Sequence, residues 1–245
     1  MNESWVLLFG ANSDIATATA RHFAAKGYNI QLASRDIEEL KKTASDISIR
    51  YDVDVKAFNF DATDYESHAE FYQALNEKPD GVILAFGAMY DQEEAQKDFS
   101  ITKQTIETNY VGAVSILEIV ATAFETRQHG FIAAISSVAG DRGRKSNYIY
   151  GSSKAALSSY LQGLSHRLAR SNVSVLTVKP GFVDTKMTDH LELPKLVTAQ
   201  PKDVAKAIYN GVKKSKGTVY VKGVWRFIML IIIHIPSFIF KKTNL

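Results

Sequence analysis

The sequence predicts a single α/β domain built on a doubly wound, mainly parallel sheet of seven strands. Three observations lead to this prediction. Short apolar runs alternate with helical stretches along nearly the whole chain. Most of these runs are short and mainly apolar, as expected for strands buried on both faces of a parallel sheet. The alternation of strands and helices implies right-handed crossovers. Because the chain contains no internal repeat or linker, it is expected to form one domain.

The elements follow from this pattern in chain order. Strands are expected at 5–9, 28–33, 54–60, 81–86, 130–135, 172–178 and 217–221. Helices are expected at 14–26, 36–50, 64–77, 99–127, 147–170 and 201–214. With 245 residues, the chain is long enough for one large α/β domain. We therefore assign residues 1–222 to the domain and residues 223–245 to a C-terminal tail.

Composition narrows the functional classes. The chain has no cysteine, so it has no disulfide framework and no thiolate chemistry, which is typical of a reducing compartment such as the cytoplasm. Its six histidines show no metal-binding spacing, and we expect no metal site. The start of the chain, MNESWVLLFG, lacks the features of a signal peptide and is expected to form the first strand. We expect no nucleic-acid partner.

Charge is distributed unevenly along the chain. The net charge is +3, yet the last acidic residue is Asp203 and eight basic residues follow it. Residues 1–205 therefore hold 21 basic and 26 acidic residues, a net charge of −5. An acidic body is followed by a basic tail.

The tail also contains an apolar segment. Residues 227–240, FIMLIIIHIPSFIF, are fewer than the ~20 residues that cross a bilayer as a helix, and Pro236 would interrupt such a helix. Basic residues flank the segment on both sides, which favours a position in the interface of an anionic membrane. We expect peripheral membrane contact through residues 225–242. The alternative is an arm packed over the body or across a dimer interface.

The stretch 148–157, YIYGSSKAAL, contains a candidate acid–base pair. Tyr150 and Lys154 are four residues apart, so on a helix their side chains share one face. A phenol titrates near ~10 in water, and an adjacent ammonium lowers that pKa, which suits general acid–base catalysis. In isolation the spacing is common by chance, and a helix N-terminus with a solvated lysine is the alternative.

The turn after the first strand, FGANSDIATATARHF, is a candidate phosphate-binding loop. Ligands of such sheets bind beyond the carboxyl ends of the strands. Gly10 allows a tight turn, and Ser13 or Asp14 is suited to cap the next helix, whose N-terminal amides attract a pyrophosphate. Asp14 and Ala16 stand where dinucleotide-binding loops usually have glycines, so an ordinary strand–helix turn is an equal alternative.

The second strand ends in ASRDIEEL. A carboxylate at this tip would bind the ribose 2′-hydroxyl of NAD and repel a 2′-phosphate. Here Ser34 is followed by Arg35, which favours the phosphorylated dinucleotide through a charge-assisted contact. The alternative is a solvated arginine that opens a helix, and the neighbouring Asp36 weakens the preference.

These motifs together resemble the short-chain dehydrogenase/reductase family. Asn109 lies in TNYVGA, Ser137 lies thirteen residues before Tyr150 in ISSVAG, and PGFVDT at 180–185 follows the sixth strand. The combination N-x-x-G, S-x(12)-Y-x(3)-K and P-G-x-x-x-T is highly specific, and the similarity covers residues 5 to about 222. The resemblance implies a Rossmann fold and an oxidoreductase that reduces a keto group to an alcohol with NADP(H), with NADPH preferred over NADH because of Arg35.

The resemblance also implies roles for individual residues. Tyr150 would protonate the substrate oxygen, and Lys154 would lower the pKa of Tyr150 and hold the nicotinamide ribose. Ser137, rather than its neighbour Ser136, would hydrogen-bond the substrate carbonyl. Asn109 would hold a water linked to Lys154. The implied cofactor-binding residues are Gly10, Asn12, Ser13, Asp14, Ile15, Ser34, Arg35, Asp61, Ala62, Ala85, Gly87, Tyr150, Lys154, Pro180, Gly181, Val183 and Thr185, with Asp61 at the adenine.

Two departures from the family pattern affect the cofactor loops. Gly10 alone remains of the usual three-glycine turn, and the usual Asn-Ala-Gly after the fourth strand is replaced by Ala85, Phe86 and Gly87.

The AFG sequence, the S-x-I-A turn and PGFVDTKMT resemble the branch that reduces a 2-keto pentose on a polyprenyl phosphate. In mycobacteria these reductases act with a flavin oxidase to make decaprenylphosphoryl arabinose. The closing stretch VYVKGVWRFIMLIIIHIPSFIFKKTNL resembles the tail of that branch.

The branch resemblance implies a lipid-linked keto-sugar, a flavin oxidase partner and a role in cell wall biosynthesis at the inner face of the cell membrane. One alternative keeps the chemistry but changes the substrate to a 3-oxoacyl, steroid-like or free-sugar carbonyl. Another is a non-catalytic dinucleotide-binding scaffold whose tail docks on a membrane or partner.

A basic cluster, Arg142, Arg144 and Lys145, is hypothesised to meet a substrate phosphate, with a solvated loop as the alternative. Residues 186–200 are expected to form a substrate lid, and pairing through the fourth and fifth helices, usual in the family, implies a dimer or tetramer.

Overall fold

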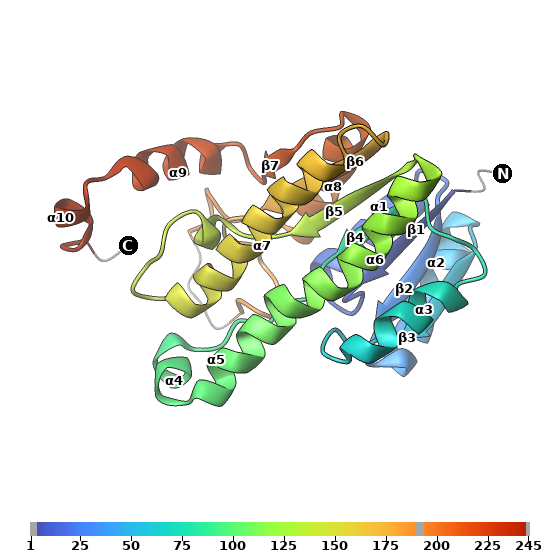
Figure 1. Ribbon diagram of the computed structural model, residues 1–245, viewed down its shortest axis with the longest axis horizontal. Coiled ribbons are helices and arrows are strands. Elements are labelled where there is room, and N and C mark those ends of the chain that lie inside the picture. Colours follow the sequence, from blue (N-terminus) through green and yellow to red (C-terminus); the bar gives the residue numbers. More distant parts are fainter. Residues whose placement is uncertain (1–3, 190–193, 244–245) are drawn as a thin grey trace.

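The structure, a computed structural model, describes residues 4–189 and 194–243 and is centred on one sheet (Figure 1). Its seven strands are all parallel, in the order β3-β2-β1-β4-β5-β6-β7, which confirms the predicted doubly wound fold. The strands are β1 (Trp5–Phe9), β2 (Asn29–Ser34), β3 (Val55–Asn59), β4 (Gly81–Leu84), β5 (Gly130–Ile135), β6 (Val173–Lys179) and β7 (Thr218–Tyr220).

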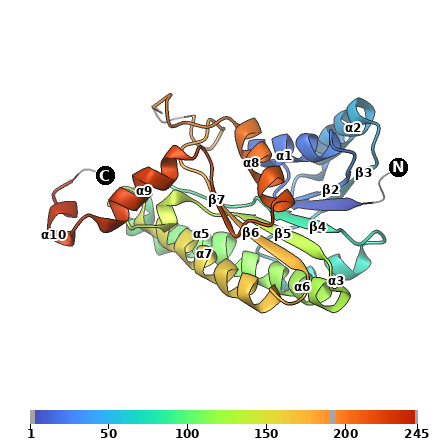
Figure 2. The same ribbon diagram turned by 90° about the horizontal axis from the view of Figure 1, so that it is seen from above.

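Helices cover both faces of the sheet. Figure 2 shows α1, α2 and α8 on one face and α3, α6 and α7 on the other. The α-helices are α1 (Asp14–Ala24), α2 (Ile37–Tyr51), α3 (His68–Ala74), α4 (Gln92–Lys97), α5 (Phe99–Ile106), α6 (Gly112–Arg127), α7 (Tyr148–Leu168), α8 (Pro201–Lys213), α9 (Val224–His234) and α10 (Ser237–Phe240). Short 3-10 turns occur at Tyr65–Ser67 and Val138–Gly140, and a π-helical turn at Glu107–Val111.

The mainly apolar strands are explained by two hydrophobic cores, one on each side of the sheet. In β1, Val6 and Leu8 pack with α1, α2 and α8, whereas Leu7 and Phe9 pack with α3, α6 and α7. All four side chains are fully buried. A strand between two helical layers has no solvent face, so it needs no polar positions.

Two predicted helices are divided in the structure. The segment predicted as one helix at 99–127 contains α5, the π-helical turn and α6. Gly112 follows the π-helical turn, and a Cβ atom there would lie 2.1 Å from the carbonyl oxygen of Ala62, so the helix approaches the loop after β3 closely. The predicted helix 64–77 is a 3-10 turn followed by α3. Helix α4 was not predicted, since its six residues are too few for a periodic signal.

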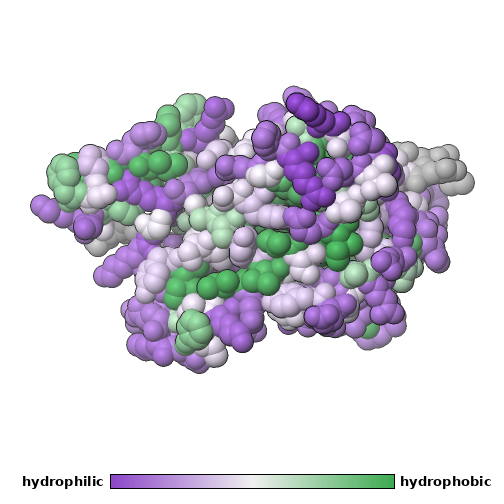
Figure 3. All heavy atoms as spheres, in the orientation of Figure 1, coloured by the Kyte–Doolittle hydropathy of each residue, from purple (hydrophilic) through white to green (hydrophobic). Residues whose placement is uncertain are grey.

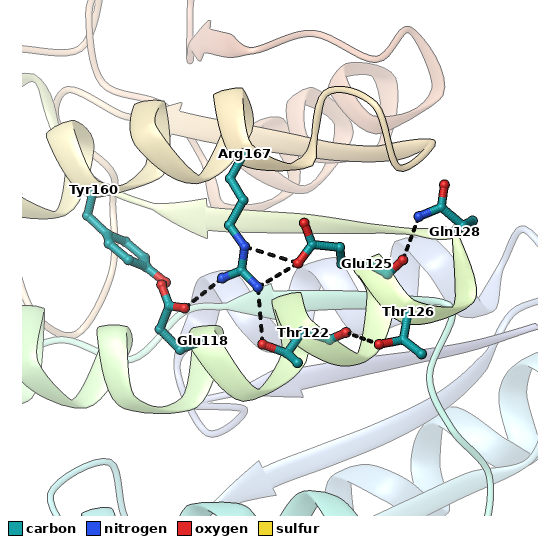
Figure 4. A network of polar contacts seen from close by, with 7 residues as sticks. All are labelled: Glu118, Thr122, Glu125, Thr126, Gln128, Tyr160 and Arg167. Atoms are coloured by element: carbon teal, nitrogen blue, oxygen red, sulfur yellow. Dashed lines mark hydrogen bonds and ion pairs between the residues drawn. The ribbon is translucent and has the colours of Figure 1, made fainter.

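Helices α6 and α7 are joined by a polar network on their outer side (Figure 4). Arg167 of α7 donates to Glu125 at 2.6 Å and to Glu118 at 2.8 Å, both on α6. Tyr160 of α7 donates to Glu118 at 2.9 Å. These contacts fix the position of α7 beside α6, and α7 carries the candidate acid–base residues.

Residues 224–240, which we call the C-terminal arm, extend away from the sheet in both views (Figures 1 and 2). Helix α9 ends at His234, and Pro236 precedes the single turn of α10, so the chain breaks where the proline was expected to interrupt a helix. One side of α9 packs on the body through buried Trp225, Met229 and Ile232. Within residues 4–189 and 194–243, no helix has the length and apolar character needed to span a bilayer.

Candidate active site

A cavity of about 720 Å³ lies at the carboxyl ends of the strands. This is the position at which open parallel sheets bind ligands, and the volume is in the range of small-molecule sites. The structure brings together in its lining every residue expected to bind the cofactor, from Gly10 to Thr185, along with Ser137, Tyr150 and Lys154. Asn109 is fully buried behind the lining.

The turn after β1 depends on a glycine. Gly10 has φ +73°, and a Cβ atom there would lie 2.5 Å from the backbone nitrogen of Phe86. Only glycine accommodates both the left-handed conformation and this close approach. Phe86 is one of the departures from the family pattern, and the structure shows that its backbone closes over Gly10.

The N-terminus of α1 faces the cavity. Ser13, one of the two predicted caps, is the N-cap, and its hydroxyl accepts a hydrogen bond from the backbone of Ala16 at 3.2 Å. The other, Asp14, accepts a hydrogen bond from the backbone of Lys186 at 2.9 Å and so ties this turn to the loop after β6. Asn12 donates to the carbonyl oxygen of Asp36, and its Oδ1 is buried without a hydrogen-bond partner. The amides at this helix N-terminus fit a phosphate, and the unpaired oxygen of Asn12 can accept from a hydroxyl of the same ligand.

The end of β2 brings Arg35 close to Asp61. Burial would raise the pKa of Asp61, but hydrogen bonds from the backbone and hydroxyl of Thr63, both 2.8 Å, and the charge of Arg35 lower it below its usual value. Asp61 is therefore an ionised acceptor at neutral pH. Ser34 and Arg35 both line the cavity, where a 2′-phosphate of a dinucleotide would require a cation.

The side chains of Ser137 and Tyr150 line the cavity together, close enough for Ser137 to affect the pKa of Tyr150. Ser137 is the N-cap of the 3-10 turn after β5, and Tyr150 lies in the first turn of α7. Burial raises the pKa of Tyr150 to about 12, and the nearby Ser137 side chain lowers it only in part. The lowering effect predicted for Lys154 stays a prediction, because desolvation of the phenolate is the largest contribution to this pKa. Tyr150 therefore holds its proton at neutral pH.

Lys154 lies beneath Tyr150 and is 3% exposed. Its Nζ is 5.8 Å from the centroid of the Tyr150 ring and donates to the carbonyl oxygen of Ile135 at 3.0 Å. Burial lowers the pKa of Lys154 to about 8. A Cβ atom on Gly87 would lie 3.2 Å from this nitrogen and from Oδ1 of Asn109, so a larger residue here would require these side chains to shift by a few tenths of an ångström.

Asn109 lies in the π-helical turn, and its side chain is hydrogen-bonded to protein groups on all sides. Its Oδ1 accepts from the backbone of Ala88, and its Nδ2 donates to the carbonyl oxygen of Ala88 and to Ser153 Oγ. Asn109 thus ties the β4 loop to α7. The hypothesis that it holds a water remains a prediction.

The hydroxyl of Ser136 is used in hydrogen bonds within the protein, which is consistent with its exclusion from the catalytic residues. Its hydroxyl donates to the carbonyl oxygen of Lys154 at 2.9 Å and pairs with the hydroxyl of Ser158 at 2.7 Å. It joins β5 to α7 and leaves Ser137 to face the cavity.

The loop after β6 meets the C-terminal arm. A Cβ atom on Gly181 would lie 1.9 Å from the ring of Trp225, which packs edge-on against Phe182 with ring centroids 5.5 Å apart. The indole nitrogen of Trp225 donates to the carbonyl oxygen of Val197 at 2.9 Å. The arm therefore supplies one wall of the cavity. Of the lid expected at 186–200, residues 190–193 lie outside the described residues.

The basic cluster at 142–145 separates into three environments. Arg142 Nη1 donates to the carbonyl oxygens of Ile233 and Ile235 at 2.9 and 2.7 Å, at the end of α9, and its guanidinium stacks 3.9 Å from the centroid of Phe240. Lys145 is exposed, and Arg144 lines the cavity. The hypothesis of a three-residue phosphate site is therefore wrong for Arg142, which caps the arm instead.

Several lining residues were not identified from the sequence. Met89, Tyr90, Asn147 and Trp225 all line the cavity. Trp225 was noted only as part of an apolar tail, since nothing in the tail sequence indicates which body residues it contacts. Within the described part of the chain, no group of three or more metal-ligating side chains could hold an ion.

Comparisons with known proteins agree with this geometry. Residues 4–195 match the short chain dehydrogenase family. The chain is 32% identical over 240 residues to an uncharacterized oxidoreductase of Mycobacterium tuberculosis, covering 97% of this chain and 96% of the relative. It is 33% identical over 240 residues to an uncharacterized oxidoreductase of Streptomyces coelicolor, covering 97% and 94%.

Solved structures share the fold. A short-chain dehydrogenase from Sphingobium yanoikuyae in complex with NADPH has a TM-score of 0.77 at 22% identity, covering 96% of this chain and 97% of that one. A variant of actinorhodin polyketide ketoreductase with NADPH has a TM-score of 0.81 at 22% identity, covering 92% and 98%. The family match extends over the strands and loops that place Gly10, Ser137, Tyr150 and Lys154 around one cavity. The chain therefore belongs to the short chain dehydrogenase family.

Proposed function

We propose that the protein reduces a keto group to an alcohol with NADPH. The observation that carries the proposal is that Ser137, Tyr150 and the buried Lys154 line one cavity, together with the Gly10 turn and Arg35. The family match and the oxidoreductase names of the relatives support it. When bound, NADPH supplies the hydride that forms the new C–H bond.

The chain's own residues supply the proton and the positioning. Tyr150 holds its proton at neutral pH, so its hydroxyl is a donor to the carbonyl oxygen as negative charge develops there. Ser137 donates a second hydrogen bond to the same oxygen. Lys154, with a pKa of about 8, is mostly protonated at pH 7 and restores the proton to Tyr150. The pair therefore combines a protonated phenol with a buried proton source.

Arg35 is proposed to select NADPH over NADH by pairing with the 2′-phosphate. The Arg35→Gln variant should lower the ratio of kcat/KM for NADPH to kcat/KM for NADH by about tenfold or more, the value of a charge-assisted contact. Lys41→Gln removes the same charge from the exposed side of α2 and should leave the ratio unchanged. Equal efficiency with both cofactors in the wild type would overturn this assignment.

The substrate is proposed to be a keto-pentose on a polyprenyl phosphate, made by a flavin oxidase partner, as in the branch that the sequence resembles. The test compares turnover of keto-pentosyl polyprenyl phosphate with that of a 3-oxoacyl thioester, a steroid ketone and a free keto-sugar. Preference for one of the last three would retain the reductase and replace the substrate. Absence of turnover with all four, while NADPH binds, would favour the non-catalytic scaffold.

The C-terminal arm is proposed to lie on an anionic bilayer at the inner face of the cell membrane, as a separate unit from the domain at 1–222. Figure 3 shows hydrophobic side chains gathered over the arm. Its outward residues Phe227, Leu230 and Ile231 are 67%, 57% and 68% exposed. Exposed basic residues, Arg226, Lys241 and Lys242, adjoin these apolar side chains. This combination is typical of an interfacial helix.

Vesicle sedimentation tests the arm. Vesicles containing phosphatidylglycerol should bind the protein at least about tenfold more tightly than phosphatidylcholine vesicles, because each basic residue near an anionic surface adds roughly 1 kcal/mol. Ile231→Asp should abolish binding, whereas Ile49→Asp, at a residue 83% exposed on α2, should have no effect. If Ile231→Asp instead converts a dimer to a monomer and vesicles do not bind, the arm is an interface between copies.

A homo-oligomer through α6 and α7 is proposed separately and is tested by its mass in solution.

A further inference from the structure

The loop between Ser137 and Tyr150 presents one arginine to the cavity. Arg144 lines the cavity together with Ser137, Tyr150 and Trp225. The loop is held at its base by a buried ion pair, in which Lys179 Nζ lies 2.5 Å from Asp141 Oδ1. It is held at its far end by the hydrogen bond from the backbone of Asn147 to the carbonyl oxygen of Arg144, at 3.2 Å. The position of Arg144 is therefore set by the fold.

The guanidinium of Arg144 lacks an acidic partner among the described residues. Its Nη2 contacts the thioether sulfur of Met229 at 3.3 Å, and its Nε is buried without a hydrogen-bond partner. Asp141 is the acid whose charge acts on Arg144, but its two oxygens are bound by Lys179 and by the hydroxyl of Tyr220 at 2.8 Å. A thioether is a weak acceptor, so no acid of residues 4–189 or 194–243 pairs directly with the guanidinium of Arg144.

An uncompensated guanidinium in a partly buried site is unfavourable. Burial lowers the pKa of Arg144, yet arginine stays protonated in proteins, so the charge remains. The buried Nε–H has lost its water without gaining an acceptor, which opposes folding. An anionic oxygen group in the cavity would supply both the acceptor and the counter-charge. Asn147, whose Oδ1 is also buried without a partner, can accept a hydrogen bond from a hydroxyl beside that anionic group.

We propose that Arg144 and Asn147 form a subsite for an anionic oxygen group, a phosphate or a carboxylate, carried by the substrate. The identification of the bound molecule as substrate rests on the proposed reductase function. The subsite is distinct from the position of Arg35. Arg35 follows β2 and Arg144 follows β5, which are three strand spacings apart in the sheet, or about 14 Å. One group of the dinucleotide therefore does not account for both arginines.

The test measures binding rather than turnover. Isothermal titration calorimetry is performed on protein saturated with NADPH, so that Arg35 is occupied, with phenyl phosphate, benzoate and benzyl alcohol as probes. We expect at least one anion to bind the wild type about tenfold or more tightly than the neutral alcohol, as a charge-assisted contact predicts. Arg144→Gln should remove this preference. Lys145→Gln, which removes the same charge from the exposed neighbouring residue, should retain it.

The two anions identify the group, and further variants separate binding from folding. Tighter binding of phenyl phosphate indicates a phosphate, and tighter binding of benzoate a carboxylate. Arg144→Lys keeps the charge and should recover part of the preference, while Met229→Leu removes the sulfur contact and should leave it intact. Unchanged affinity of Arg144→Gln for NADPH shows that the cavity is folded.

The subsite is overturned if the anions bind the wild type no more tightly than benzyl alcohol, or if Arg144→Gln loses affinity for all three probes equally. The latter result would mean that Arg144 holds the arm. If Arg144→Gln loses anion binding but the wild type reduces no ketone, the subsite is retained and the proposed reductase function is refuted. Ketone reduction with no anion preference would refute the subsite alone.

Discussion

The body and the C-terminal arm line the same cavity, but they are held in place by different interactions. Ser137, Tyr150 and Lys154 lie on β5 and α7, which are embedded in the sheet and the helical layer behind it. The arm is held by one buried face, centred on Trp225, and its other face is exposed. The comparison indicates that the body fixes the chemistry, whereas the arm shapes the entrance and can change without disturbing the reacting groups.

The largest expected effect separates the two regions by activity. Tyr150→Phe removes the proton donor and should lower kcat for ketone reduction by about 100-fold or more, the range of general acid catalysis. The affinity for NADPH, measured by fluorescence titration, should stay within about twofold, since only one hydroxyl is lost.

Tyr148→Phe is the matched control for this variant. Tyr148 is exposed on the same helix, and its hydroxyl donates to the side chain of Gln96 on α4 at 3.2 Å. The Tyr148→Phe substitution should have no effect on kcat. If Tyr148→Phe lowered kcat and Tyr150→Phe did not, the assignment of the acid would be wrong.

The next effect concerns the arm. Trp225 is 5% exposed, and its truncation to alanine should weaken docking of α9 by about 3 kcal/mol, as for other buried aromatic residues. Hydrogen exchange of the α9 amides should accelerate by about 100-fold, while exchange in β5 and α7 stays unchanged. Phe227→Ala, at an exposed position of the same helix, serves as the control. Equal acceleration in β5 would show that the arm and the body unfold together.

The body was largely predictable from the sequence, and the arm was not. The apolar strands and the spacing of Ser137, Tyr150 and Lys154 are local patterns, so both the sheet and the contents of the cavity followed from them. The π-helical turn at Asn109 depends on close packing against the β3 loop, which no local pattern encodes. The partners of Arg142 and Trp225 lie about 90 and 28 residues away in the chain, so their contacts required coordinates. The raised pKa of Tyr150 could not be foreseen, because the spacing to Lys154 says nothing about desolvation.

The buried lysine gives the body a pH dependence that the arm lacks. Lys154 has a pKa of about 8 in the folded protein and about 10.5 when unfolded. Between these values the unfolded chain binds the extra proton, so the folded state gains stability as the pH rises from about 8 to about 10.5. Below pH 8 the charged, buried lysine costs up to about 3 kcal/mol.

This linkage is measured as a difference. The free energy of unfolding from urea titrations should rise with pH for the wild type relative to Lys154→Met, by up to about 3 kcal/mol between pH 8 and pH 10.5. The subtraction removes the contributions of other groups that titrate there, such as Tyr150 itself. Parallel pH curves for the two proteins would show that Lys154 is solvated in the folded state.

The smallest effect distinguishes buried from exposed contacts within the body. Arg167 bridges α7 to Glu118 and Glu125, but its side chain is 36% exposed, so water and salt screen the pairs (Figure 4). Arg167→Gln should lower the free energy of unfolding by about 0.5 kcal/mol, and the loss should vanish in about 1 M salt. Exchange of the α9 amides should not change, because the network joins α7 to α6, whereas α9 packs on Val138 and Phe182. A loss that persists in high salt would mean that the network orients α7, and with it Tyr150, more strongly than its exposure indicates.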